Sequence, residues 1–323
     1  MRNYLSSALA ALSMAGLLSA AGQVHAQSAP WPQQPLRWIV GFAPGGTADV
    51  LTRIAAGQLA EKLGQSVVVE NRPGASGAIA LQQAAQSAPK DIMLITVPGP
   101  IIYPRNEPEI GKELTPIMLL AEGPMVIVGP TKNKENTLKE VIGSAMAQPN
   151  AWSYATSGTG TSQHLAGELL NHSAKIELVQ VPYKGGGQAV SDVVGAQVPL
   201  AILGPTPVLP HIRNHALKAY AVTTTYRLES LPNVPTVQEA GIPGYDASQW
   251  FAAATVKGVA PEHINRINEL LAEIVKTPTF KDALDAAGMI AGKGSPSDLQ
   301  TFLDQDRKKW ADLIKATGLS VGH

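Results

Sequence analysis

Two glycine-rich turns hold the residues best suited to bind a small anion. They are 42–49 (FAPGGTAD) and 157–162 (SGTGTS), and each lies between an apolar run and a segment with helical periodicity. Glycines allow backbone N–H groups to converge, and the positive end of the following helix attracts negative charge. Each turn alone could use glycine only for a tight connection. Because ligands of open α/β sheets bind beyond the carboxyl ends of the strands, the pair predicts a site for a ligand with one or two carboxylates.

The sequence motifs give little support for nucleotide binding, hydrolase activity or a metal site. The chain lacks the G-x-x-x-x-G-K-[ST] and G-x-G-x-x-G nucleotide patterns, the G-x-S-x-G elbow and the H-E-x-x-H zinc motif. Ser157 or Ser162 with His164 is the best pair of nucleophile and base. Their short spacing at a helix start makes an exported hydrolase the weaker hypothesis. No group of His, Asp and Glu has ligand spacing, so we expect no metal and no cofactor.

Four other residues allow two interpretations each. Asp49 either caps the first helix or orients a bound water or a ligand amine. Lys184 either faces the ligand or is solvated, and Trp250 and Phe251 either line the cleft or fill the core. The sequence leaves these alternatives open.

Strands and helices are expected to alternate along the chain and so to position the two turns. Apolar runs predict strands at 36–42, 66–69, 91–97, twice within 116–129, and at 152–155, 176–181, 200–203 and 217–222. Helical periodicity predicts helices at 50–63, 78–88, 138–147, 163–170, 187–194, 261–276, 279–287 and 296–317. The alternation favours parallel sheets with crossover helices. We expect two α/β lobes, formed by 33–120 with 225–323 and by 121–224.

Composition narrows the class of protein. The 323 residues carry 25 Lys and Arg against 25 Asp and Glu, so the basic excess of a nucleic-acid binder is missing. The hydrophobic fraction of 45% excludes wholesale disorder. The chain contains no cysteine, which excludes thiol catalysis, disulfides and cysteine-based zinc sites.

The first 26 residues have the pattern of a secretory signal. Arg2 precedes the uncharged stretch 5–21, and the small residues Val24 and Ala26 match a cleavage site after Ala26. A transmembrane anchor is the alternative, but the stretch is short and rich in Ala and Ser. We therefore expect a protein of the bacterial periplasm.

The turn 42–49 resembles the start of the receptors of tripartite tricarboxylate transporters, also called Bug proteins. The resemblance continues through 67–77 (VVVENRPGASG), 156–169 (TSGTGTSQHLAGEL), 181–198 and 219–245. It implies the α/β fold of a type II periplasmic binding protein, with two lobes that close on a ligand. It also implies capture of a small carboxylate (a di- or tricarboxylate or an aromatic acid) and no enzymatic activity.

The resemblance also implies which residues bind the ligand. In the family the two turns grip a ligand carboxylate, and Asn71 and Gly99 match positions beside the first turn and at the cleft edge. The residues expected at the site are Phe42, Pro44, Gly45, Gly46, Thr47, Asp49, Asn71, Gly99, Ser157, Gly158, Thr159, Gly160, Thr161, Ser162 and His164.

Two segments depart from the family pattern. The stretch 98–112 is shorter and more polar than usual. The segment 203–207 (LGPTP) replaces the acidic or polar residue that usually ends the preceding strand, which should alter the wall of the second lobe.

The expected partners are a small carboxylate ligand and a membrane permease that takes up the ligand. A membrane sensor protein is the alternative partner, and the receptor itself is expected to be a monomer that binds no nucleic acid.

Overall fold

A computed structural model describes residues 31–100, 108–149 and 151–317 of the chain. The predicted signal sequence and residues 101–107 of the shortened stretch 98–112 lie outside these residues. Residues 34–323 cluster as one unit that contains two sheets.

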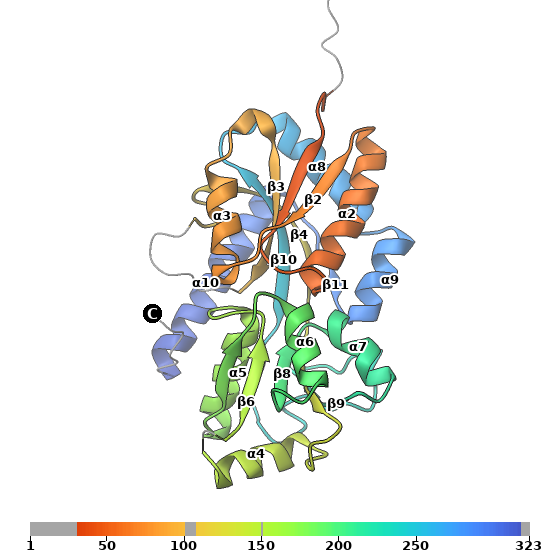
Figure 1. Cartoon of the computed structure of the whole chain (residues 1–323). Coiled ribbons are helices and arrows are strands. Elements are labelled where there is room, and N and C mark those ends of the chain that lie inside the picture. The colour runs from red at the N-terminus through yellow and green to blue at the C-terminus, as the bar shows by residue number, and fades with distance from the viewer. Residues whose placement is uncertain (1–30, 101–107, 150, 318–323) are drawn as a thin grey trace, which may run out of the picture. The chain divides into compact units, whose positions relative to one another are not determined.

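The six-stranded sheet has the order β11-β4-β10-β3-β1-β2. Its strands are β1 (Leu36–Val40), β2 (Val67–Asn71), β3 (Met93–Gly99), β4 (Leu114–Gly123), β10 (Gln249–Val256) and β11 (Ile290–Ala291). β1 pairs in parallel with β2 and β3, whereas β10 is antiparallel to β3 and β4. Its neighbouring helices are α2 (Thr47–Leu63), α3 (Ala78–Ala85), α8 (Pro261–Ile274), α9 (Pro278–Ala287) and α10 (Pro296–Thr317), with short 3₁₀ turns at Ala75–Gly77 and Pro89–Asp91 (Figure 1).

The five-stranded sheet has the order β7-β6-β8-β5-β9. Its strands are β5 (Val126–Pro130), β6 (Ser153–Thr156), β7 (Val179–Pro182), β8 (Leu200–Leu203) and β9 (Leu217–Val222). β6 is parallel to β7 and β8, and β5 is antiparallel to β8 and β9. Its helices are α4 (Leu138–Ala147), α5 (Ser162–Ala174), α6 (Gly186–Val194) and α7 (Pro205–Arg213).

The predicted α/β class is confirmed, but the expectation of parallel sheets is wrong in part. Both sheets are mixed, because the chain inserts β5 and β10 antiparallel to their neighbours. Three elements were not predicted: α7, β10 and β11. α7 carries three prolines in nine residues, which is typical of a loop, and alanine-rich β10 has weak strand propensity although every residue in it is buried.

Helix α10 contributes to the hydrophobic cores of both sheets. Leu299 and Leu303 near its start pack with residues of β1, β3 and β10. Trp310, further along the helix, packs with Val237, Tyr245 and the core residues of β5, β6 and β8. The last helix therefore joins the two halves of the fold.

Among the described residues, no helix combines the length and the apolar character needed to cross a membrane.

Candidate ligand-binding site

The two predicted turns meet at a small cavity, which we call the inner chamber. Its volume is about 30 Å³. The first turn contributes Phe42, Gly46 and Thr47 to its wall, and the second contributes Ser157, Thr161 and Ser162. The fold thus brings together two segments more than a hundred residues apart, as the sequence led us to expect.

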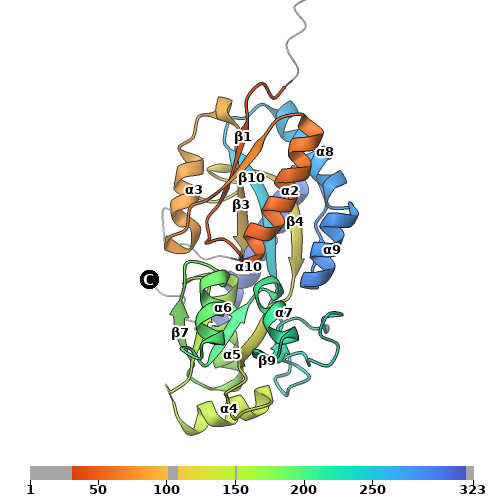
Figure 2. The same cartoon turned by 45° about the vertical axis from the view of Figure 1, so that its right-hand side comes forward.

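Four helices begin at the inner chamber. Its wall includes first or N-cap residues of α2, α5, α6 and α7, namely Gly46, Thr47, Thr161, Ser162, Gly186 and Gly204. Figure 2 shows the starts of α2, α6 and α7 drawn towards one region. The first N–H groups of a helix lack intrahelical partners, and each N-terminus carries a partial positive charge. The chamber is therefore electropositive through its backbone.

No charged side chain lines the inner chamber within the described part of the chain. The rest of its wall is Ala48, Pro98, Gln163, Pro207, Gln249 and Phe251. The segment 203–207 that departs from the family pattern thus reaches the wall through Gly204 and Pro207. Pro205 and Pro207 lack an N–H group, so the start of α7 offers few hydrogen-bond donors to the chamber. Its main contribution is the partial positive charge of the helix N-terminus.

Thr47 carries an unsatisfied hydroxyl group at this chamber. The residue is 6% exposed, and its Oγ1 atom has no hydrogen-bond partner among the described residues. A Cβ atom at Gly204 would collide with this Oγ1, so a glycine at 204 keeps the space beside the hydroxyl open. A buried hydroxyl without a partner costs about 1–3 kcal/mol, which a ligand that accepts its hydrogen bond would offset.

Asp49 holds the first turn in place. Its carboxylate accepts hydrogen bonds from Gly45 N at 3.0 Å, Arg53 Nε at 3.0 Å and Asn71 Nδ2 at 2.8 Å. Burial raises the pKa of Asp49, but these three donors outweigh it and hold the pKa below its usual value. Asn71 also donates to Phe42 O at 3.0 Å. Asp49, Gly45 and Asn71 therefore brace the turn and do not line the chamber.

His164 braces the second turn in a similar way. Its Nδ1 accepts a hydrogen bond from Gly160 N at 3.0 Å. Burial lowers the pKa of His164 to about 4, so the imidazole is neutral at neutral pH and can act as this acceptor. Glu168 Oε1 lies 3.7 Å from His164 Nε2, but a neutral imidazole forms no ion pair with it. The Gly160 N–H group, expected to face the ligand, is thus occupied by His164.

The other polar groups of the second turn are also tied to one another. Ser157 N donates to Gln163 Oε1 at 2.7 Å, and Thr161 Oγ1 donates to Gly158 O at 2.7 Å. Gln163 was not predicted as a site residue, yet it both fixes the turn and lines the chamber. A Gln directly after two hydroxyl residues at a helix start is the sequence signal for it.

The first turn also touches the start of α6. Ala43 N donates to Lys184 O at 2.9 Å. A Cβ atom at Gly187 would lie 2.6 Å from Pro44 O, and one at Gly185 would lie 2.8 Å from Ala43 N. The glycine triplet 185–187 therefore permits a close approach, although these glycines are not among the predicted site residues.

A second cavity, which we call the outer chamber, adjoins the inner one. Its volume is about 280 Å³, and Phe42 and Ser157 line both chambers. Gly158, Thr159 and Lys184 also lie in its wall. The structure thus places Lys184 at a cavity beside the two turns.

Gly99 lies outside both chambers and supports packing. It ends β3 opposite Trp250 of β10, and a Cβ atom there would collide with the indole ring. Trp250 and Phe251 point to opposite faces of β10, so Phe251 reaches the inner chamber while Trp250 lies in the core. Each of these two aromatic residues takes one of the alternatives left open by the sequence.

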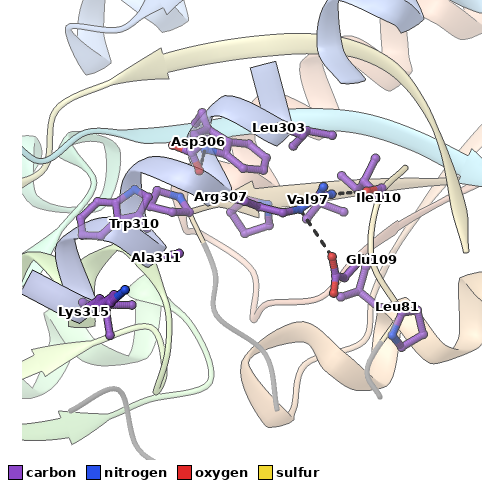
Figure 3. A pocket seen from close by; sticks show the side chains of 15 residues that line it. Leu81, Val97, Glu109, Ile110, Leu303, Asp306, Arg307, Trp310, Ala311 and Lys315 are labelled. Atoms are coloured by element: carbon purple, nitrogen blue, oxygen red, sulfur yellow. Dashed lines mark hydrogen bonds and ion pairs between the residues drawn. The ribbon is translucent and has the colours of Figure 1, made fainter. Parts of the chain in front are cut away.

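A third cavity has a different character. It measures about 490 Å³ and lies along α10 (Figure 3). Asp306 accepts a hydrogen bond from Trp250 Nε1 at 3.1 Å, and Arg307 Nε lies 3.4 Å from Glu109 Oε2. Burial raises the pKa of Asp306. Because Arg307 already has protein partners and two of the four charged side chains in its wall are acidic, this cavity suits an anion less than the inner chamber.

No cluster of three His, Asp or Glu side chains suited to a metal ion occurs among the residues described.

Comparisons with known proteins give a matching family and similar solved structures. The family described as "Tripartite tricarboxylate transporter family receptor" matches residues 51–319. Protein BugT of Bordetella pertussis is 32% identical over 298 residues, which cover 90% of this chain and 91% of BugT. The solved structure of the periplasmic binding protein BugD is 29% identical, with a TM-score of 0.84 over 90% of this chain and 99% of that one. R. palustris Rpa4515, solved with adipate, is 28% identical, with a TM-score of 0.84 and the same coverage.

Proposed function

Because this chain belongs to the family of tripartite tricarboxylate transporter receptors, which bind solutes and are not enzymes, we propose that it captures a small organic carboxylate in the inner chamber. The observation that carries the proposal is the unpaired hydroxyl of Thr47 at a cavity where four helices begin. A carboxylate accepts hydrogen bonds from a hydroxyl and from several N–H groups at once. Hydrogen bonds to a charged acceptor are about twice as strong as neutral ones.

The size of the inner chamber supports a carboxylate group. A volume of about 30 Å³ holds about two water molecules, since one water occupies about 10–15 Å³ by this measure. Two waters take about the same space as the two oxygens of a carboxylate. In our proposal the rest of the ligand extends out of the chamber towards the adjoining outer chamber, whose wall shares Phe42 and Ser157.

The absence of charged side chains from the described wall favours reversible capture. A buried lysine or arginine left without its ligand would incur a large desolvation cost, whereas helix N-termini are part of the folded backbone. The site can therefore release its ligand without exposing an unpaired buried charge. This property suits a receptor that delivers what it binds.

Lobe closure gives such a receptor its binding cycle. In our proposal the lobes are 33–120 with 225–323, and 121–224, and the ligand is trapped as they close. The receptor works in the periplasm after removal of the signal sequence 1–26, and it passes the carboxylate to a membrane permease. The predicted signal and the adipate bound to Rpa4515 support these steps.

A thermal-unfolding panel tests the proposal. The purified protein is unfolded and refolded to remove any carried-over ligand, then heated with aliphatic monocarboxylates, dicarboxylates, citrate-like acids, acidic amino acids and aromatic acids. A ligand at about 100 times its Kd adds about 2.7 kcal/mol to the free energy of unfolding, which raises Tm by several degrees. The matching amides serve as controls and should give no shift. Equal shifts from acids and amides, or none from any acid, would refute carboxylate capture.

A further inference from the structure

The outer chamber combines one cation with hydroxyl groups on an apolar floor. Lys184 is the only charged residue in its wall among those described, and Ser157, Ser76 and Thr159 bring hydroxyl groups to the wall. Ser76 and Thr159 donate theirs to Thr159 O and Gln180 Oε1, which leaves the Ser157 hydroxyl for a ligand. Phe42 and Pro182 provide apolar surface. The chamber therefore has the chemistry to receive an acidic group joined to a hydrocarbon chain.

The backbone holds Lys184 firmly beside the first turn. Its carbonyl oxygen accepts the hydrogen bond from Ala43 N. The preceding residue, Tyr183, donates its hydroxyl hydrogen to Asp192 Oδ2 at 2.6 Å, which anchors the segment to α6. The exposed Lys184 side chain thus extends from a fixed point, and no salt bridge links it to a carboxylate in the described part of the chain.

The two chambers present different means of binding negative charge. The inner chamber uses helix N-termini and the Thr47 hydroxyl, and the outer one uses an ammonium group. Because Phe42 and Ser157 line both chambers, a ligand that reaches from one to the other must pass these two residues. An aliphatic chain can pack against the Phe42 ring on that path.

We propose that Lys184 binds the second acidic group of the ligand, so that the receptor selects dicarboxylates over monocarboxylates of equal length. This inference rests on the proposed function, because the first carboxylate must occupy the inner chamber. Lys184 then acts as a specificity residue. A partly exposed ion pair contributes up to about 1 kcal/mol, which corresponds to a change of about fivefold in Kd.

The test compares diacids with their half-amides. Succinate, glutarate and adipate and the half-amide of each are titrated by calorimetry into the full chain and its variants. The half-amide keeps the length of the ligand and removes one charge. We expect the wild-type protein to bind at least one diacid up to about fivefold more tightly than its half-amide, with a preference that weakens as ionic strength rises.

Three variants separate the charge of Lys184 from its packing. Lys184→Met keeps the length of the side chain and should abolish the preference for the diacid while leaving half-amide binding unchanged. Lys184→Arg should retain the preference. Lys139→Met, at an exposed position on α4 remote from both chambers, should behave as the wild-type protein does.

The outcomes distinguish this inference from the proposed function. If Lys184→Met keeps the diacid preference, or if the wild-type protein binds both forms equally, Lys184 does not select the ligand although carboxylate capture stands. If no acid of the wider panel binds the wild-type protein, the proposed function fails and this inference fails with it.

Discussion

Replacing Thr47 by valine should stabilise the ligand-free protein and weaken ligand binding at the same time. The substitution exchanges a hydroxyl group for a methyl group of similar size. Since the hydroxyl is buried without a partner, its removal takes away a desolvation cost of about 1–3 kcal/mol. The chamber has room for water near the hydroxyl, so we expect the lower end of this range. A gain of about 1 kcal/mol raises Tm by roughly 2–4 °C.

The expected loss of affinity follows from the same hydroxyl. A hydrogen bond to a charged group contributes about 1.5–3 kcal/mol, so Kd should rise about 10- to 150-fold. Urea unfolding measures the first effect, and calorimetric titration with the carboxylate identified in the panel measures the second. Opposite signs for stability and affinity are the signature of a group retained for binding.

Thr52 provides a matched control on the same helix. Its hydroxyl donates to Ala48 O at 2.6 Å and lies 2.6 Å from Thr96 Oγ1. Thr52→Val removes satisfied hydrogen bonds and should therefore lower the free energy of unfolding by about 1 kcal/mol while leaving Kd unchanged. If Thr47→Val also lowers stability and binds the ligand as the wild-type protein does, our account of the inner chamber is wrong.

Three further outcomes are expected. Gly187→Ala pushes the start of α6 away from the first turn and should raise Kd about tenfold, whereas Gly143→Ala, with open space around its Cβ, should only stabilise α4 by up to about 1 kcal/mol. His164→Asn keeps an acceptor for the second turn but does not titrate. The pKa of His164 is about 4 in the folded protein and about 6.5 in the unfolded protein. The free energy of unfolding of the wild-type protein, measured with urea, should therefore fall as the pH is lowered from 6.5 to 4, and it should fall less in the variant. Ser76→Ala removes the 2.6 Å hydrogen bond from Ser76 Oγ to Thr159 O, and stopped-flow measurements should show ligand dissociation about fivefold faster.

The place of the site was predictable from the sequence because both turns follow a strand and start a helix. This local pattern needs no knowledge of distant contacts. The contributions of Gly186 and Gln249 were not predictable, because they reach the chamber only through the order of the strands. Antiparallel β10 illustrates the difficulty, since its alanine-rich sequence gives no clear alternation and its position between β3 and β4 depends on tertiary pairing.

The sequence also could not predict which polar atoms of the turns face the ligand and which face the turns themselves. Asp49, His164 and Gly160 lie in the expected segments but direct their polar atoms back to the turns themselves. A single side-chain rotation decides whether such a group faces the ligand or its own loop. Family resemblance locates the turns, whereas only the hydrogen-bond geometry separates Thr47, which is unsatisfied, from Asp49, which has three donors.

The small volume of the inner chamber requires that the site open before a ligand can enter. Two hydrogen bonds tie the turns to other segments beside the chambers in the described structure: Ala43 N of the first turn donates to Lys184 O before α6, and Ser76 Oγ donates to Thr159 O of the second turn. At about 1 kcal/mol each, their loss would leave an open form populated at roughly a few per cent, which is enough to admit ligand from solution. Gln249 connects ligand binding with this opening through two contacts. It lines the inner chamber, and its Nε2 donates a hydrogen bond to Pro124 O, between β4 and β5, at 2.9 Å. A ligand in the inner chamber would lie against Gln249, which is hydrogen-bonded to the segment that connects the two sheets, so that binding can bias the hinge through this residue.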